Sequence, residues 1–246
     1  MLTAIFSDIH ANRQAFEACL AAARAKAVER IVLLGDFVGY GADPQWVVDK
    51  VRELVSQGAI ALLGNHDHAV SHHDVRMNLA AQVAIEWTRG ELNAAQRRFL
   101  DQLPLEHRAG EALFVHADAS APRSWNYVLD ASDAAASMQA TNAHVTFCGH
   151  VHQPAVHAMS SAGKLTTFAP VTDVSITLLQ GRQWLIVAGS VGQPRDGITA
   201  ASYLLFDDAR GEVTFCRAPY DVATASAAIR ARGLPPWLAD RLLQGR

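Results

Sequence analysis

The sequence lacks the features of secreted and membrane-spanning proteins. It has only three cysteines, widely spaced and without a CxxC pair, at Cys19, Cys148 and Cys216. This pattern fits a reducing compartment better than a disulfide framework. No run approaches the roughly 20 apolar residues of a membrane helix, and the apolar stretch at residues 1–6 is too short for a signal sequence. We therefore expect a cytoplasmic protein that does not bind membranes.

Basic side chains are not in excess either. The chain has 21 Lys and Arg against 24 Asp and Glu, a formal charge of −3, which disfavours stable binding to nucleic acid but not to a nucleotide-sized substrate. There is no linker, repeat or low-complexity tract. With 246 residues, 50% of them hydrophobic, the chain can bury one large core. We expect residues 1–246 to form a single domain. The sequence does not indicate whether the protein forms oligomers.

The first half alternates apolar runs with helical patterns. Residues 2–7, 31–34 and 60–63 predict buried strands, and residues 13–27 and 44–57 predict the helices between them. This βαβαβ order indicates that the fold begins with a parallel sheet.

The second half has a different character. Residues 77–103 predict two helices, the second capped by Asn93, and the chain closes with helices near 222–232 and 236–243. Between them, short strands separated by turns indicate a mainly antiparallel arrangement. The expected strands are 112–115, 145–148, 166–168, 174–179, 184–188, 203–206 and 213–217. The fold class is therefore mixed α/β (α+β).

Polar residues that can bind metals follow the predicted strands directly. Because ligand sites of open α/β sheets lie at the carboxyl ends of strands, we expect these side chains to converge. They are Asp8 and His10 after the first strand, Asp36 after the second, Asn65, His66 and Asp67 after the third, and then His116, His150 and His152.

This mixture of donors indicates a class of metal. Carboxylate, imidazole and amide oxygen together suit Mn²⁺, Fe or Zn²⁺ better than Ca²⁺ or a structural Cys-ligated zinc. Two metals about 3.5–4 Å apart need one bridging carboxylate and about three further ligands each. Each tripeptide is weak evidence alone, because a lone Asp or His is more often a cap or a core residue. Their order and their positions after apolar runs carry the signal.

The order of these motifs along the chain resembles that of a known family. The pattern D-x-H, G-D, G-N-H-[DE], H and G-H-x-H, spread over residues 8–152, resembles that of the calcineurin-like metallophosphoesterases. The segments 8–12, 35–41 and 189–197 are similar to the small bacterial phosphodiesterase branch. The resemblance implies a four-layer αββα sandwich of two mixed β-sheets flanked by helices.

The resemblance also implies roles for the residues. Two divalent metal ions, of Mn, Fe or Zn, are implied, with Asp36 bridging them. The implied ligands are Asp8, His10 and His152 for one ion, and Asn65, His116 and His150 for the other. His66 matches the catalytic histidine, which stabilises or protonates the leaving oxygen.

We expect a phosphodiesterase or phosphatase that hydrolyses a small phosphorylated molecule, such as a dinucleoside polyphosphate. A hydroxide bridging the two metals would attack phosphorus in line. A protein phosphatase is the main alternative, although such enzymes usually have Val-Asp-Arg-Gly where this chain has Val38-Gly39-Tyr40-Gly41. A nuclease is disfavoured by the acidic balance, and a non-catalytic metal-binding scaffold by the complete set of site residues.

Two residues are candidates for substrate binding. Arg195 could hold a phosphate bidentately, although it could equally pair with Asp196 on a surface turn. Asn12, at the start of the first helix, could also reach the site.

Other residues near the motifs have two interpretations each. Asp67 could orient a histidine or cap the chain, and Trp125 and Tyr127 could stack a nucleotide base or pack a loop. The cluster of His68, His72 and His73 suggests either a third metal site or, as we prefer, a solvated loop beside the active site.

Overall fold

The strands form two six-stranded sheets in the computed structural model, which describes residues 1–246. In spatial order, the first sheet consists of β3 (Ile60–Ala61), β2 (Arg30–Leu33), β1 (Leu2–Phe6), β11 (Ala201–Asp207), β12 (Glu212–Ala218) and β9 (Ser175–Thr177). The second consists of β4 (Glu106–Ala109), β5 (Ala112–Val115), β6 (Val145–Cys148), β10 (Arg182–Val187), β7 (Ala155–Ser160) and β8 (Leu165–Phe168).

Both sheets are mixed. Strands β1, β2 and β3 are parallel, as the βαβαβ pattern predicted, and β11 joins β1 antiparallel. Most strand pairs of the second half are antiparallel, as expected, but β5, β6 and β10 at the centre of the second sheet are parallel. Helix α6 (Ala131–Gln139), which the sequence interpretation missed, lies between β5 and β6 and makes that parallel crossover possible.

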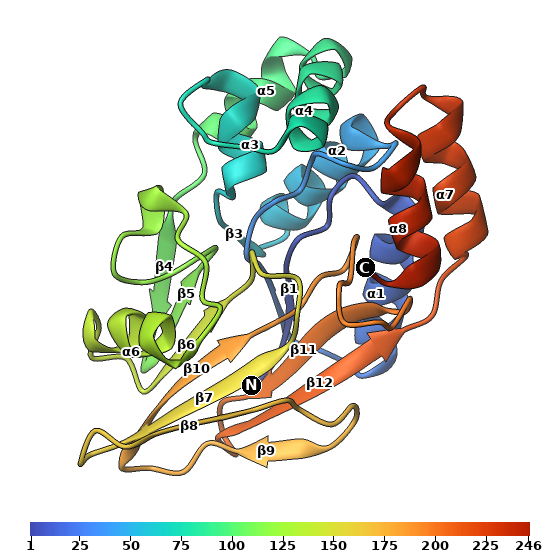
Figure 1. Ribbon diagram of the computed structural model, residues 1–246. Helices are drawn as coiled ribbons and strands as arrows, with labels where there is room; N and C mark the ends of the chain where they lie inside the picture. Colours follow the sequence, from blue (N-terminus) through green and yellow to red (C-terminus); the bar gives the residue numbers. More distant parts are fainter.

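Alternation along each strand gives the sheets their two apolar faces. In β1, Ile5 faces the core between the sheets, while Phe6 packs with Phe16 of α1 (Arg13–Ala25) on the outer side. Helix α2 (Pro44–Ser56) covers the same outer face, and α6 covers the outer face of the second sheet. The layers are therefore αββα, with α6 on one side and α1 on the other in Figure 1.

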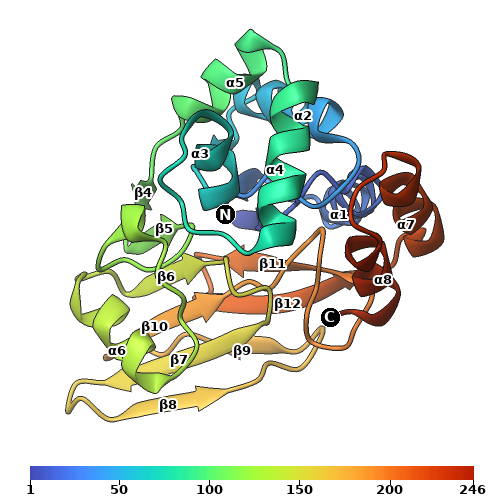
Figure 2. The ribbon, with the colours of Figure 1, turned by 45° about the horizontal axis from the view of Figure 1, so that its top comes forward.

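The remaining helices surround one end of the sandwich. They are α3 (Asn65–Ser71), α4 (Leu79–Glu91), α5 (Ala94–Asp101), α7 (Val222–Ala231) and α8 (Pro236–Gln244), with a short 3-10 turn at Pro122–Ser124. Figure 2 shows α3, α4 and α5 grouped together and α7 beside α8. Side chains of α4, α7 and α8 share a small separate core. None of the helices combines the length and apolarity that crossing a bilayer requires.

Several elements, including β1, α1 and β9, are shorter than the sequence predicted, and three were not expected in addition to α6. The third strand is only Ile60–Ala61 rather than residues 60–63, and α3, β4 and β7 were not expected. In contrast, β5 and β6 have the predicted bounds, and Asn93 caps α5 through the backbone N–H groups of Ala95 and Gln96.

Candidate metal centre

Seven side chains with metal-binding atoms gather where the strands of both sheets end. They follow β1, β2, β3, β5 and β6, and none is more than 5% exposed. They are Asp8, His10, Asp36, Asn65, His116, His150 and His152. Three groups within this region, each with atoms within 4.8 Å of one another, could hold an ion: Asp8 with His10 and His152, His10 with Asp36 and His66, and Asp36 with His116 and His150.

Asp36 lies between the two halves of the cluster. Its Oδ2 is 3.7 Å from Nε2 of His10 and 3.4 Å from Nε2 of His116. Its Oδ1 accepts the backbone N–H of His66 at 2.8 Å, which fixes the orientation of the carboxylate. One carboxylate oxygen is thus directed at both histidines, as a bridging ligand would be.

Each of the four histidines has one ring nitrogen bonded to a backbone carbonyl. Nδ1 of His10, His116 and His152 donates to Val38, Leu34 and Gln193, respectively, at 2.8–3.0 Å. His150 differs, because its Nε2 donates to the carbonyl of Trp125 at 3.0 Å. Since a carbonyl only accepts, these bonds fix the tautomers and leave the other nitrogen as a potential ligand. Metal-binding histidines are usually held in this way, by a hydrogen bond from the ring nitrogen that does not bind the metal.

The free nitrogens of His10 and His152 face each other in an arrangement that suits a bound cation. Nε2 of His10 and Nε2 of His152 lie 3.0 Å apart, although both rings already donate through Nδ1. Burial holds the pKa of both imidazoles below their usual range, so both are neutral near pH 7. Two lone pairs would therefore oppose each other beside Asp8, whose Oδ1 is 3.4 Å from His152. The donor set fits a divalent cation at this point.

The backbone of the cluster is also strained. Asp8, His10, Asp36, His150 and His152 all have positive φ, between 48° and 66°. Left-handed backbone in residues other than glycine costs about 1–3 kcal/mol each and concentrates at functional sites. At these five positions the left-handed backbone directs the side chains into the cluster. A regular strand would direct them away from it.

Comparison with known families agrees with this geometry. Residues 1–210 match the model of the calcineurin-like phosphoesterase superfamily domain. The chain belongs to that superfamily. Divalent metal ions are implied for its members, and the clustered His and Asp groups could bind them.

Similar proteins match this chain over its whole length. An uncharacterized protein of Methanocaldococcus jannaschii is 35% identical, covering 100% of this chain and 98% of its own. The crystal structure of a metallophosphoesterase from Sphaerobacter thermophilus has a TM-score of 0.87 at 34% identity, with 100% of both chains covered. A hypothetical protein from Pyrococcus horikoshii shares the fold, with a TM-score of 0.79 at 18% identity over 100% of this chain and 98% of its own. The predicted αββα fold is confirmed.

His66 lies beside this cluster. Its ring is 4.8 Å from that of His10 and 4.5 Å from that of Tyr40, centroid to centroid. Its buried Nδ1 has no hydrogen-bond partner, unlike the four histidines above. A Cβ at residue 39 would lie only 2.4 Å from that nitrogen, so Gly39, which has a φ of +84°, gives the ring its space.

Arg195 faces the cluster rather than its sequence neighbour. Asp196 pairs with Arg217, which excludes the surface-turn pairing of Arg195 with Asp196. The Arg195 guanidinium instead donates to Gln193 Oε1 at 2.8 Å, and its central carbon lies 5.7 Å from the centre of the Tyr40 ring. Tyr40 was not identified as a site residue from the sequence. Its signal was its position in the Gly35–Gly41 motif, where protein phosphatases have arginine.

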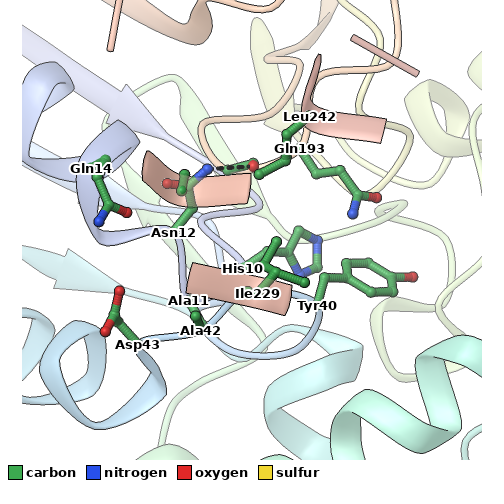
Figure 3. A pocket seen from close by; sticks show the side chains of 13 residues that line it. His10, Ala11, Asn12, Gln14, Tyr40, Ala42, Asp43, Gln193, Ile229 and Leu242 are labelled. Atoms are coloured by element: carbon green, nitrogen blue, oxygen red, sulfur yellow. Dashed lines mark hydrogen bonds between the residues drawn. The ribbon is translucent and has the colours of Figure 1, made fainter. Parts of the chain in front are cut away.

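Asn12 is turned away from the cluster. Its Nδ2 donates to the Gly192 carbonyl at 2.8 Å and to the Tyr220 hydroxyl at 3.3 Å, and its Oδ1 accepts from Ala15 as the N-cap of α1. Figure 3 shows this amide pointing away from His10, in a cavity of about 10 Å³ that has room for little more than one water molecule. The amide is thus engaged within the fold, and substrate binding by Asn12 stays a prediction.

The two interpretations of Asp67 are resolved by its hydrogen bonds. Its carboxylate accepts the backbone N–H groups of Phe37, Val38 and Gly64 at 2.9–3.2 Å. It therefore caps the chain and joins two ligand-bearing loops rather than orienting a histidine.

The flanking loops lie against the cluster. The ring of Tyr127 stacks on His150, with centroids 4.0 Å apart, and Trp125 has a left-handed backbone with a φ of 55°. On the other loop, His68 stacks on His72 and bonds Asp74, while His72 bonds Asp101. Both histidines thus have acidic partners, although His68, His72 and Asp101 together also form a group that could hold an ion.

Proposed function

We propose that this phosphoesterase hydrolyses esters of small phosphorylated molecules at a centre of two divalent metal ions. We also propose that residues 1–246 act as one domain, since both sheets supply residues to that centre. The single observation that carries the proposal is the position of Asp36, whose Oδ2 lies within 3.7 Å of histidine nitrogens on both sides.

The residues present would hold the ions as two sets joined by Asp36. Asp8, His10 and His152 form one set, and Asn65, His116 and His150 form the other. When bound, the ions would lower the pKa of coordinated water and offset the negative charge of the phosphate. All other groups in the proposal belong to the chain.

We assign His66 to the leaving group rather than to metal binding. The four proposed ligand histidines have tautomers fixed by carbonyls, whereas His66 Nδ1 is unpaired. Burial lowers the pKa of His66 to about 4, so its ring is neutral near pH 7 in the absence of substrate. A neutral N–H can donate a hydrogen bond to a leaving oxygen, and the negative charge of a bound phosphate would raise the pKa and make full protonation easier.

We propose that Arg195 binds the phosphate. Its guanidinium has no carboxylate partner and lies over Tyr40, the residue that stands where protein phosphatases have their phosphate-binding arginine. Arg195, although it comes from a different segment, would thus lie near the position that the phosphate-binding arginine has in protein phosphatases. A guanidinium in this position can bind two phosphate oxygens at once.

Hydrolysis of bis-p-nitrophenyl phosphate by purified protein tests the proposal. We expect activity that EDTA abolishes and Mn²⁺ restores. Phosphopeptide hydrolysis far faster than hydrolysis of small esters would favour a protein phosphatase instead. If the metal-loaded protein hydrolyses neither aryl diesters nor aryl monoesters, it is a non-catalytic scaffold.

A further inference from the structure

A cavity beside the proposed metal centre is lined mainly by side chains that the proposed function does not use. It measures about 450 Å³, within the size range of small-molecule sites. Asn65 and His150 form its inner wall, so it opens directly onto one half of the metal centre. Its other lining residues are Asp74, Val75, Arg76, Arg123, Ser124, Trp125 and Tyr127.

Two arginines on opposite loops line this cavity. Arg76 comes from the segment between α3 and α4, and Arg123 from the 3-10 turn before Trp125. Neither takes part in an ion pair or a side-chain hydrogen bond. Asp74, the acidic residue of the wall, bonds instead to His68, with its Oδ1 3.2 Å from Nε2. Two guanidinium groups are therefore available to an anion, in a chain whose formal charge is −3.

The wall that carries Arg123 is attached to the metal centre. The Trp125 carbonyl accepts the Nε2 proton of His150 at 3.0 Å, and the Tyr127 ring stacks on the same imidazole. The positive φ of Trp125 is what turns this short segment back onto His150. A group bound beside Arg123 would consequently lie next to a phosphate bound at the metals.

We propose that this cavity is a subsite for a second phosphate group of the substrate, held between Arg76 and Arg123. The inference rests on the proposed function and narrows it to substrates that carry a phosphate next to the scissile one, such as a phosphoanhydride chain. Guanidinium groups match phosphate oxygens bidentately, which favours a phosphate as the occupant over an uncharged alcohol group.

The test compares the activities of the unmodified protein and one double variant on three substrates. The substrates are bis-p-nitrophenyl phosphate, the p-nitrophenyl ester of thymidine monophosphate, and diadenosine tetraphosphate. Only the last has phosphates on both sides of a scissile bond, and the thymidine ester has a base but a single phosphate. The variant combines Arg76→Gln with Arg123→Gln. Its matched control combines Arg182→Gln with Arg210→Gln, two exposed arginines at the opposite end of the strands.

We expect the Arg76/Arg123 variant to lose about tenfold or more in kcat/KM for the tetraphosphate, since each lost charge-assisted contact costs about that factor. Its activity on both single-phosphate esters should stay within about twofold of the unmodified protein, as should the control on all three substrates. An equal loss on the thymidine ester would overturn the inference and indicate a nucleoside subsite. The inference would also be overturned if the variant lost no activity on the tetraphosphate, or if the unmodified protein did not hydrolyse the tetraphosphate at all. In either case, hydrolysis of the aryl diester would still support the proposed function.

Discussion

The Nε2 atoms of His10 and His152 face each other at 3.0 Å across the centre of the site. Both imidazoles donate through Nδ1 to backbone carbonyls, so neither Nε2 carries the proton that would make this contact a hydrogen bond. Such a pair, with Asp8 beside it, is unfavourable in a buried site unless a cation lies between the nitrogens.

Removal of the metals should therefore destabilise the protein. Because an ion that binds only the folded chain stabilises it by RT ln(1 + [L]/Kd), a concentration 100-fold above Kd should add about 2.7 kcal/mol. The melting temperature should rise with added Mn²⁺ and fall after treatment with EDTA, as measured by calorimetry. A melting temperature that does not respond to either would contradict a metal site in the folded chain.

Substitution of His66→Ala should separate catalysis from metal binding. Loss of a proton donor should lower kcat by about 10²–10⁴-fold, while the metal content measured by elemental analysis stays unchanged. His107→Ala, on the edge strand β4, is the matched control and should leave kcat as it is. If His66→Ala loses a metal ion, His66 is a ligand, in keeping with its proximity to His10 and Asp36.

Gly39→Ala should disturb the same histidine without removing it. The added methyl group would lie 2.4 Å from His66 Nδ1, and the left-handed backbone adds strain. We expect kcat to fall while the metals remain, with a smaller loss of stability than a core truncation causes. Gly58→Ala shares a positive φ but has open space around it, so it controls for backbone strain alone.

Arg195→Gln should weaken phosphate binding. A charge-assisted hydrogen bond contributes about 1.5–3 kcal/mol, so kcat/KM should fall by at least about tenfold. Inorganic phosphate should also become a weaker competitive inhibitor, which steady-state kinetics can measure. Arg210→Gln at an exposed turn provides the control, and an Arg195→Gln variant with unchanged phosphate inhibition would remove Arg195 from the substrate site.

Metal binding should release protons over a defined pH range. Burial alone would lower the pKa of His116, but Asp36 outweighs it and raises the pKa to about 9 in the metal-free chain. Below about pH 9, His116 is protonated in the metal-free chain and must lose its proton to bind a metal ion. Affinity should consequently rise with pH up to about that value and level off above it. Calorimetry in buffers of different ionisation enthalpy would measure the released proton; a heat independent of buffer would contradict this assignment.

The sequence predicted best those strands in which every residue is buried. Strands β5 and β6 are continuous apolar runs with every residue buried, and their bounds followed directly. Strand β4 is a half-exposed edge strand of polar residues, and β7 contains the buried His157, so neither has an apolar pattern. Helix α6 does have a sequence signal, because Asp130 and Asp133 form a capping box at its first turn.

The site was predictable in composition but not in detail. The order of motifs after strands placed all seven proposed ligands, and the structure brings them together. Helix α3 escaped detection because its first residues, from Asn65 on, are the site residues themselves and carry no helical periodicity. Long-range contacts decided the rest, such as Arg195 over Tyr40 and the Asn12 amide bonded to Gly192.

The central claim, that Asp36 joins two metal ions, is tested most directly by the metal content of Asp36→Asn. Elemental analysis of the unmodified chain, loaded with Mn²⁺ and desalted, should give about two ions per chain. The variant, in which the shared oxygen loses its charge, should retain one ion or none and have no esterase activity. Two ions retained by Asp36→Asn, or none bound by the unmodified chain, would contradict the account.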